Sequence, residues 1–128
     1  MVFFLETVEH LPDTKLLPTL GEIRRILKTD GVLICSTRNE ENLLKNKVLC
    51  PDCGCVFHRM QHVRSFSAEI LTKSMEGCGF KTIYCNGVFL FDFLDGLYFS
   101  MKRLMRKCRD LLLGDPAGPN LIYIGRKS

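Results

Sequence analysis

The sequence predicts an α/β fold, because short apolar runs alternate with amphipathic segments along most of the chain. The runs "VFFL", "VLICS" and "KTIYC" have the length and continuity of strands buried within a sheet. The segments that separate them carry apolar residues at helical spacing. A strand, a helix and a second strand form a unit whose strands are parallel and whose crossover is right-handed. We therefore expect a mostly parallel sheet covered by helices.

The first predicted helix lies between "VFFL" and "VLICS". Its apolar side is formed by four residues at spacings of four, three and four: Leu16, Leu20, Ile23 and Leu27. Asp13 is a candidate N-cap, but Pro18 lacks a backbone donor, so the regular part is expected to begin closer to Pro18. The helix is expected to stop at "KTDG", where Asp30 or Gly31 can adopt the left-handed conformation.

A second helix of the same kind is predicted after the middle of the chain. Ser67 is its candidate N-cap, and Gly79 is expected to end it before the strand "KTIYC". The closing run "NLIYIGRK" is predicted to form the last strand, and the preceding Pro119 suits the beginning of a strand.

A basic amphipathic helix is predicted at residues 96–113. At about 100° per residue, apolar side chains gather on one side: Leu97, Met101, Leu104, Met105, Cys108 and Leu112. Basic side chains gather on the other: Lys102, Arg103, Arg106, Lys107 and Arg109. Two interpretations are open. The segment is either a cover helix whose charges are simply solvated, or a surface that meets anionic lipid, a phosphorylated substrate or an acidic partner.

The composition predicts one globular domain over residues 1–128, with 46% hydrophobic and 25% charged residues. The apolar runs are far shorter than the roughly 18 residues of a membrane-spanning helix. The N-terminus lacks a basic leader, so we expect a cytoplasmic protein. The net charge of +4 is modest, and without a nucleic-acid-binding motif no nucleic acid partner is expected. Four scattered cysteines are expected to act as small buried hydrophobes: Cys35, Cys78, Cys85 and Cys108.

The other three cysteines and two histidines crowd into the stretch "CPDCGCVFHRMQH". Cys50 and Cys53 are separated by two residues at a tight turn and followed by glycine, which is the form of a zinc knuckle. His58 and His62 are four residues apart, so on one helical turn they would share a side and complete a tetrahedral Cys2His2 site. Because only four residues separate Cys53 from His58, Cys55 could replace one histidine, or a ligand could come from elsewhere.

Residues 1–43 contain three motifs in order: Glu9-His10-Leu11 after the first strand, "RILKTDG" at the end of the first helix and "STRN" at the end of the second strand. In order and spacing they resemble the "EHL", "RxLKPGG" and "STPN" motifs in the second half of class I S-adenosylmethionine-dependent methyltransferases of type 11. The resemblance implies a Rossmann-like, three-layer α/β/α fold with a mostly parallel sheet and a final antiparallel strand. The departures are Thr29-Asp30 for Pro-Gly and Arg38 for Pro, which affect turn geometry more than chemistry.

The resemblance also implies S-adenosylmethionine as the cofactor and one wall of its site in this chain. Leu5, Glu6 and Thr7 stand at the carboxyl end of the first strand, where open α/β sheets place ligands. Glu9 and His10 are candidate catalytic residues, with His10 as an optional general base; alternatively, both serve only helix entry and local hydrogen bonding. The sequence has no "GxGxG" loop. We therefore interpret the chain as the C-terminal half of a methyltransferase domain, which needs an N-terminal half and is not expected to catalyse alone.

A longer motif, "CPxCGxxFHxxxHxRSF", begins at Cys50. It is similar to an insertion found in some bacterial type 11 methyltransferases, which implies a small metal-binding insertion at residues 48–64 above the strands. Its expected role is a lid or substrate wall stapled by a structural zinc ion, because the loop has few apolar residues of its own. Arg59 and Arg64 are then candidate anion contacts, unless they are simply solvated.

Two functional hypotheses follow from different classes of protein. The first is methyl transfer to an unknown acceptor, such as a small, anionic or lipid-linked molecule. The second is a small zinc-stapled binding module that applies its basic helix to a membrane surface or a partner and performs no chemistry.

Overall fold

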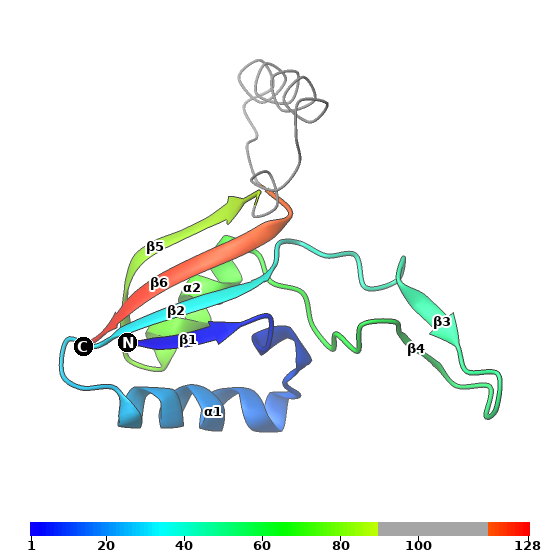
Figure 1. Cartoon of the computed structure of the whole chain (residues 1–128), viewed down its shortest axis with the longest axis horizontal. Coiled ribbons are helices and arrows are strands. Elements are labelled where there is room, and N and C mark those ends of the chain that lie inside the picture. Colours follow the sequence, from blue (N-terminus) through cyan, green and yellow to red (C-terminus); the bar gives the residue numbers. More distant parts are fainter. Residues whose placement is uncertain (90–117) are drawn as a thin grey trace, which may run out of the picture.

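The computed structural model describes residues 1–89 and 118–128 and contains a four-stranded mixed sheet (Figure 1). The strands, in the order in which they lie side by side, are β1 (Val2–Leu5), β2 (Val32–Arg38), β6 (Asn120–Lys127) and β5 (Phe80–Val88). β1 and β2 pair in parallel, whereas β6 runs antiparallel to both β2 and β5. Three strands therefore share one direction, and the last strand lies between two of them in the opposite direction. The predicted α/β class is confirmed.

Helices α1 (Asp13–Ile26) and α2 (Ala68–Gly77) pack on the same face of the sheet. Their buried side chains join those of the strands in one apolar core: Leu16, Leu20, Ile23, Leu33, Cys35, Leu71, Met75, Leu121 and Tyr123. α2 lies over β5, since the thiol of Cys85 contacts the carbonyl oxygen of Ala68 at 3.5 Å. Residues 1–89 and 118–128 thus form two of the three predicted layers. The helix predicted at residues 96–113 lies outside the described residues.

Tyr123 is the largest fully buried side chain in the described part of the chain. Its ring lies over Gly125, where an added Cβ would come within 2.3 Å of the tyrosine hydroxyl oxygen. That hydroxyl contacts Thr82 Oγ1 of the neighbouring strand at 3.4 Å. The glycine therefore makes room for the ring that fills the core between β6 and the helices.

The start of α1 differs from the prediction, and its end agrees in part. The helix begins at Asp13, with Pro12 as its N-cap, and no side chain caps it. Pro18 lies inside the helix, so the expectation that the regular part begins nearer Pro18 is wrong. Proline removes one backbone hydrogen bond, and the burial of the apolar side of the helix outweighs that loss. The helix ends at Ile26, and the left-handed residue is Asp30, with φ 58°, in the turn that leads into β2.

α2 begins and ends as predicted. Ser67 is the N-cap, and its hydroxyl oxygen accepts a hydrogen bond from the backbone N–H of Ile70 at 3.2 Å. Gly79 has φ +80°, the left-handed conformation that ends many helices. Arg24 of α1 donates from Nε to the carbonyl oxygen of Gly79 and from a terminal nitrogen to that of Ser128, both at 3.2 Å. This arginine ties α1 to the turn after α2 and to the end of β6.

The opposite face of the sheet carries a row of apolar side chains that no described helix covers. In register across the four strands, these are Phe3, Ile34, Ile124 and Tyr84. Phe3 is 63% exposed and Tyr84 is 41% exposed. The expectation that "VFFL" is buried on both faces is therefore wrong within residues 1–89 and 118–128. β1 is also an edge strand of this sheet.

The predicted insertion contains a hairpin that extends away from the main sheet (Figure 1). Its strands, β3 (Lys47–Leu49) and β4 (Val56–His58), pair antiparallel. At the base, the N–H of Glu40 donates to the carbonyl oxygen of Phe66 at 2.8 Å, which closes the loop between β2 and α2. The hairpin therefore has a tip, where the cysteines lie, and a base beside the carboxyl ends of the strands.

Candidate functional site

A cavity of about 720 Å³ lies at the carboxyl ends of β1 and β2, beside the base of the hairpin. Its lining residues are Leu5, Glu6, Glu9, His10, Ser36, Arg38, Glu41, Asn46, Arg59, Met60, His62 and Asn120. This is the edge at which open α/β sheets bind ligands. The predicted cofactor residues Leu5 and Glu6 line the cavity, whereas Thr7 does not. Both predicted catalytic residues also line it.

The end of β1 is fixed to β2 by the backbone and side chain of Glu6. The N–H of Glu6 donates to the carbonyl oxygen of Ser36 at 3.0 Å, and the Ser36 hydroxyl donates to Glu6 Oε1 at 2.7 Å. Glu6 has φ 45°, a left-handed conformation that is uncommon for residues other than glycine. The Thr7 hydroxyl donates to the carbonyl oxygen of Leu5 at 2.7 Å, so it serves the turn itself.

Glu9 and His10 lie on the short 3-10 helix η1 (Val8–His10), which follows β1. Glu9 is 1% exposed, and neither of its carboxylate oxygens has a hydrogen-bond partner among the described residues. His10 is exposed, and its Nδ1 lies 3.3 Å from the carbonyl oxygen of Gln61. A carbonyl oxygen only accepts hydrogen bonds, so Nδ1 carries the hydrogen and Nε2 of the neutral ring keeps a free lone pair. In this tautomer Nε2 is therefore the ring atom that can accept a hydrogen bond.

His62 and His58 meet at the base of the hairpin around the carboxylate of Glu41. Their rings stack with centroids 4.8 Å apart. His62 Nδ1 donates to Glu41 Oε2, and His58 Nε2 lies 3.7 Å from Glu41 Oε1. The backbone N–H of His62 donates to His58 Nδ1 at 3.2 Å. Nδ1 of His58 is thus an acceptor, and in the neutral ring Nε2 carries the hydrogen, whereas Nε2 of His62 keeps its lone pair.

The two imidazoles control the ionisation of Glu41. Burial alone would raise the pKa of this carboxyl, but the hydrogen bond from His62 and the charges of His62 and His58 bring the pKa below its ordinary value. Asn46 adds a hydrogen bond to Glu41 Oε1 at 3.2 Å. Glu41 therefore stays ionised and holds the two histidines in place. Glu41 was not among the predicted site residues, although its position shortly after the carboxyl end of a strand was an available signal.

The three cysteines lie at the tip of the hairpin. The N–H of Cys50 donates to the carbonyl oxygen of Cys55 at 2.8 Å, and Gly54 closes the turn with φ +71°. The sulfur atoms of Cys53 and Cys55 are 2.8 Å apart. The contact with the Cys55 thiol lowers the pKa of Cys53 below the ordinary thiol value, and the same contact raises the pKa of Cys55. The tip is therefore a thiol cluster.

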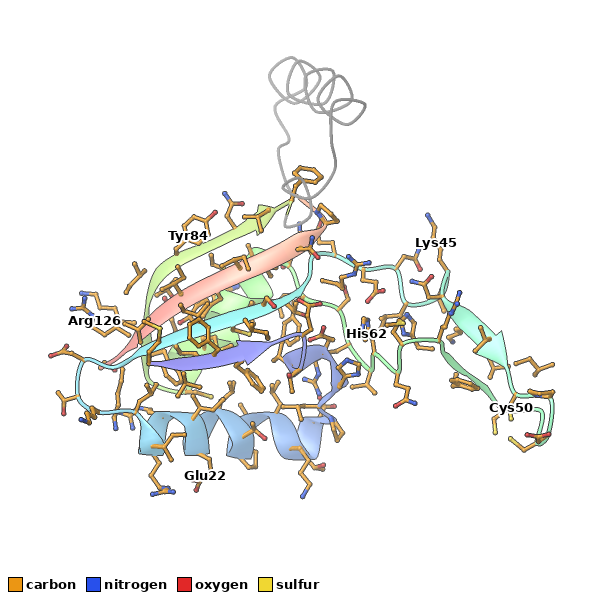
Figure 2. The ribbon with its side chains drawn as sticks, viewed as in Figure 1. Glu22, Lys45, Cys50, His62, Tyr84 and Arg126 are labelled. Atoms are coloured by element: carbon orange, nitrogen blue, oxygen red, sulfur yellow. The ribbon has the colours of Figure 1, made fainter. Side chains whose placement is uncertain are left out.

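The structure does not bring the four predicted metal ligands together. Figure 2 shows Cys50 at the far end of the hairpin and His62 near the body of the molecule. His58 pairs with Lys47 at one end of the hairpin, and Cys50 to Cys55 form the turn after Leu49 at the other end. The histidines therefore lie at the base and the cysteines at the tip. Ligands of one zinc ion each lie about 2.0–2.3 Å from it. The clusters of possible metal ligands among the described residues contain no cysteine, and a single site of Cys50, Cys53, His58 and His62 stays a prediction.

The two arginines of the insertion have different surroundings. Arg59 lines the cavity. Arg64 instead donates to the carbonyl oxygen of Leu11 at 2.5 Å and to Asp13 Oδ1 at 2.9 Å, so it is used to hold the start of α1. Arg38 also lines the cavity and donates to Asn120 Oδ1 at 3.2 Å. Arg59 and Arg38, rather than Arg64, are the cations available to a ligand here.

The chain is similar in sequence to an uncharacterized protein of Methanocaldococcus jannaschii. The two are 30% identical over 89 residues, which is 70% of this chain and 33% of the relative. No family model matches the chain. The chain therefore spans a third of the length of this relative.

Comparison with solved structures shows the methyltransferase fold. The 1,6-didemethyltoxoflavin-N1-methyltransferase of Burkholderia thailandensis, solved with S-adenosylhomocysteine, has a TM-score of 0.58 and 15% identity, covering 98% of this chain and 43% of that one. An S-adenosylmethionine-dependent methyltransferase of Archaeoglobus fulgidus has a TM-score of 0.58 and 20% identity, covering 98% of this chain and 58% of that one. The chain thus has the fold of about half of a class I methyltransferase domain. No helix among the described residues is long and apolar enough to cross a membrane.

Proposed function

We propose that the chain is part of an S-adenosylmethionine-dependent methyltransferase and forms one wall of its active site. The observation that carries the proposal is the sheet order β1-β2-β6-β5 with an antiparallel last strand, together with a cavity at the carboxyl ends of β1 and β2. In open α/β folds this is where the cofactor and the substrate lie. Fold alone does not determine the reaction, so the cavity residues carry the remaining argument.

The residues of this wall fit part of the bound cofactor. Leu5 offers an apolar contact, and Glu6 offers a carboxylate held in position by Ser36. S-adenosylmethionine would supply an activated methyl group on a sulfonium centre. Transfer of that group depends mainly on alignment of the acceptor and exclusion of water. His10 can remove a proton from the acceptor, because its Nδ1 is engaged by Gln61 and its Nε2 is the basic atom.

The acceptor is proposed to be a small polar or anionic molecule. Arg38 and Arg59 line the same cavity as Glu6 and His10 and add two cations to its wall. A guanidinium group recognises carboxylate or phosphate through paired hydrogen bonds. Contact of residues 96–113 with a membrane or a lipid-linked acceptor stays a prediction, because that segment lies outside the described residues.

The chain alone is proposed to be inactive. It has no "GxGxG" loop, and it spans 43% and 58% of the two solved methyltransferases. The apolar row that no described helix covers and the position of β1 at the edge of the described sheet support the need for an N-terminal half that completes the sheet. That half can belong to the same polypeptide or to a second one.

A structural zinc ion at the tip of the hairpin is a separate proposal. The tip offers up to three thiolate ligands, from Cys50, Cys53 and Cys55. Cys55 is the residue that the sequence offered as a replacement for one histidine ligand. Zinc prefers thiolate ligands, and a short hairpin with exposed Leu49 and Val56 has little core of its own. Loss of bound zinc in Cys53→Ser is the expected result.

The testing experiment is to translate the DNA upstream of Met1 in the same frame and to express the extended protein if a glycine-rich loop is encoded. We expect it to bind S-adenosylhomocysteine by calorimetry and to transfer labelled methyl groups, and we expect the 128-residue chain to do neither. Methyl transfer by the short chain would refute the proposed split of the site. An extended, folded protein that does not bind the cofactor would refute the methyltransferase proposal itself.

A further inference from the structure

Three groups that can bind a metal ion meet at one end of the cavity. A ligand atom from each of Glu9, His10 and His62 lies within 4.8 Å of the others. All three residues line the cavity. The rings of His10 and His62 meet edge to face with centroids 4.8 Å apart. The cluster lies at the base of the hairpin and contains none of the cysteines at its tip.

The carboxylate of Glu9 is the first observation that points to a cation. Its two oxygens are buried and have no hydrogen-bond partner among residues 1–89 and 118–128. An isolated buried carboxylate is strongly unfavourable unless a cation or hydrogen-bond donors compensate it. His10 and His62 are the donor-bearing groups beside it, but each of their Nδ1 hydrogens is already directed elsewhere.

The hydrogen bonds of the two histidines are the second observation. His10 donates from Nδ1 to the carbonyl oxygen of Gln61, and His62 donates from Nδ1 to Glu41. Both rings therefore keep the lone pair on Nε2. A histidine that binds a metal commonly donates its other ring N–H to a backbone carbonyl or a carboxylate, as these two do.

The same reasoning separates this cluster from a second one. Glu41, His58 and His62 also have ligand atoms within 4.8 Å of one another. However, His58 Nδ1 accepts a hydrogen bond from the backbone N–H of His62, so the single ring hydrogen of the neutral imidazole is on Nε2. His58 therefore has no lone pair to offer in its neutral form, and Glu41 is occupied in positioning His62. The second cluster supports the first and does not itself bind a metal.

We infer that Glu9, His10 and His62 bind a divalent transition-metal ion through the Glu9 carboxylate and the Nε2 atoms of the two histidines. Two imidazoles and one carboxylate suit Mn²⁺, Fe²⁺ or Zn²⁺, and three protein ligands leave positions for water or for an oxygen atom of a molecule in the cavity. Glu41 and the carbonyl of Gln61 are the positioning groups behind the two histidines. A bound ion would occupy Nε2 of His10, so His10 cannot act as a general base while the metal ion is bound. The inference requires neither methyl transfer nor the bound cofactor.

The test measures Mn²⁺ binding to the full chain by electron paramagnetic resonance and calorimetry. Mn²⁺ is the probe because it prefers nitrogen and oxygen ligands to thiolates. The measurement uses a Cys50→Ser, Cys53→Ser, Cys55→Ser background, which removes the thiol cluster at the tip of the hairpin as a second possible metal site. We expect one bound ion per chain. Glu9→Gln and His10→Gln should each abolish binding, and Glu41→Gln should weaken it about 10- to 100-fold.

Thermal unfolding of the same variants distinguishes a metal ligand from a structural residue. Glu9→Gln replaces a buried carboxyl group that has no hydrogen-bond partner among the described residues, so the metal-free variant should be at least as stable as the parent, while the rise in Tm on adding Mn²⁺ disappears. His10 is exposed, so His10→Gln should leave the metal-free Tm unchanged. Glu69→Gln, on the exposed side of α2, is the matched control and should keep the metal-dependent rise.

Absence of a bound ion in the thiol-free parent would overturn the inference. Unchanged binding in both Glu9→Gln and His10→Gln would also overturn it. These outcomes leave the proposed methyltransferase function standing, because that proposal is tested by cofactor binding to the extended protein.

Discussion

The two faces of the sheet are built from alternating residues of the same strands, yet they have different surroundings. On the covered face, Leu33 and Tyr123 are fully buried beneath α1 and α2. On the open face, Phe3 and Tyr84 belong to an apolar row that residues 1–89 and 118–128 leave partly exposed. Contiguous exposed apolar surface of this kind commonly marks a site of contact with another polypeptide segment. The sequence therefore suits a sheet that is covered on both faces, and this supports the proposed N-terminal half.

The largest expected effect is on the covered face. Leu33→Ala removes a fully buried side chain and leaves a cavity, so the free energy of unfolding should fall by about 2–5 kcal/mol. Ile34→Ala, the next residue along β2, changes the open face and is the matched control, with a smaller expected loss. Urea unfolding of the two variants measures both values. Equal losses would contradict the difference between the faces.

Thiol chemistry gives a second comparison between a covered and an exposed position. Burial raises the pKa of the Cys35 thiol, and the nearby Glu9 carboxylate adds to the rise. The contact with Cys55 lowers the pKa of the exposed Cys53. Iodoacetamide should therefore modify Cys53 in the folded chain at neutral pH at least about tenfold faster than Cys35. Mass spectrometry of peptides from a time course measures both rates, and comparable rates would show that the covered face opens readily.

The third prediction concerns the cluster at the base of the hairpin. The pKa of Glu41 is lowered in the folded chain, so its contribution to stability is complete above its unfolded value of about 4.3 and is lost as the pH falls through the folded value. Thermal unfolding from pH 6 to pH 3 should show a shallower fall in Tm for Glu41→Gln than for the parent. Parallel curves would show that His62 and His58 do not stabilise the charged form of Glu41.

The smallest effect is expected on the open face. Phe3 is 63% exposed, so Phe3→Ser should change the free energy of unfolding of the chain by no more than about 0.5 kcal/mol. In the extended protein, where the proposed N-terminal half covers this row, the same change should cost several times more. Urea unfolding of both forms gives the comparison. A large loss in the short chain would show that Phe3 is already packed within it.

The strands and α2 could be predicted because their signals are local. Apolar runs in the sequence indicate β1, β2 and β6. Ser67 begins α2 through its side-chain cap, and Gly79 follows the end of α2 in the left-handed conformation. The start of α1 could not be predicted in the same way. Burial of the apolar side of that helix outweighs the effect of Pro18, and such packing is not visible in a local pattern.

Only part of the candidate site could be predicted from the sequence. The residues that directly follow a strand could be identified, but the contacts that join them to residues distant in sequence could not. Leu5, Glu6, Glu9 and His10 were expected at the end of β1, and all four line the cavity. His58 and His62 do lie together, but Gln61 bends the chain with φ 59° and no helical turn joins them. Both histidines contact Glu41 because the antiparallel pairing of β3 and β4 returns the chain to the base of the hairpin. The spacing of residues in the sequence does not specify this pairing.

The position of β6 has a consequence for biosynthesis. This strand comes after β5 in the chain but lies between β2 and β5 in the sheet. Among the described strands β5 pairs only with β6, so it has no described partner until Asn120–Lys127 has been synthesised. A nascent chain that stops short of β6 would therefore lack the described strand that joins β2 to β5 in the sheet, although α1 and α2 contribute to one core. Closure of the sheet must wait until β6 has emerged, so chaperones have a defined interval in which to bind the nascent chain.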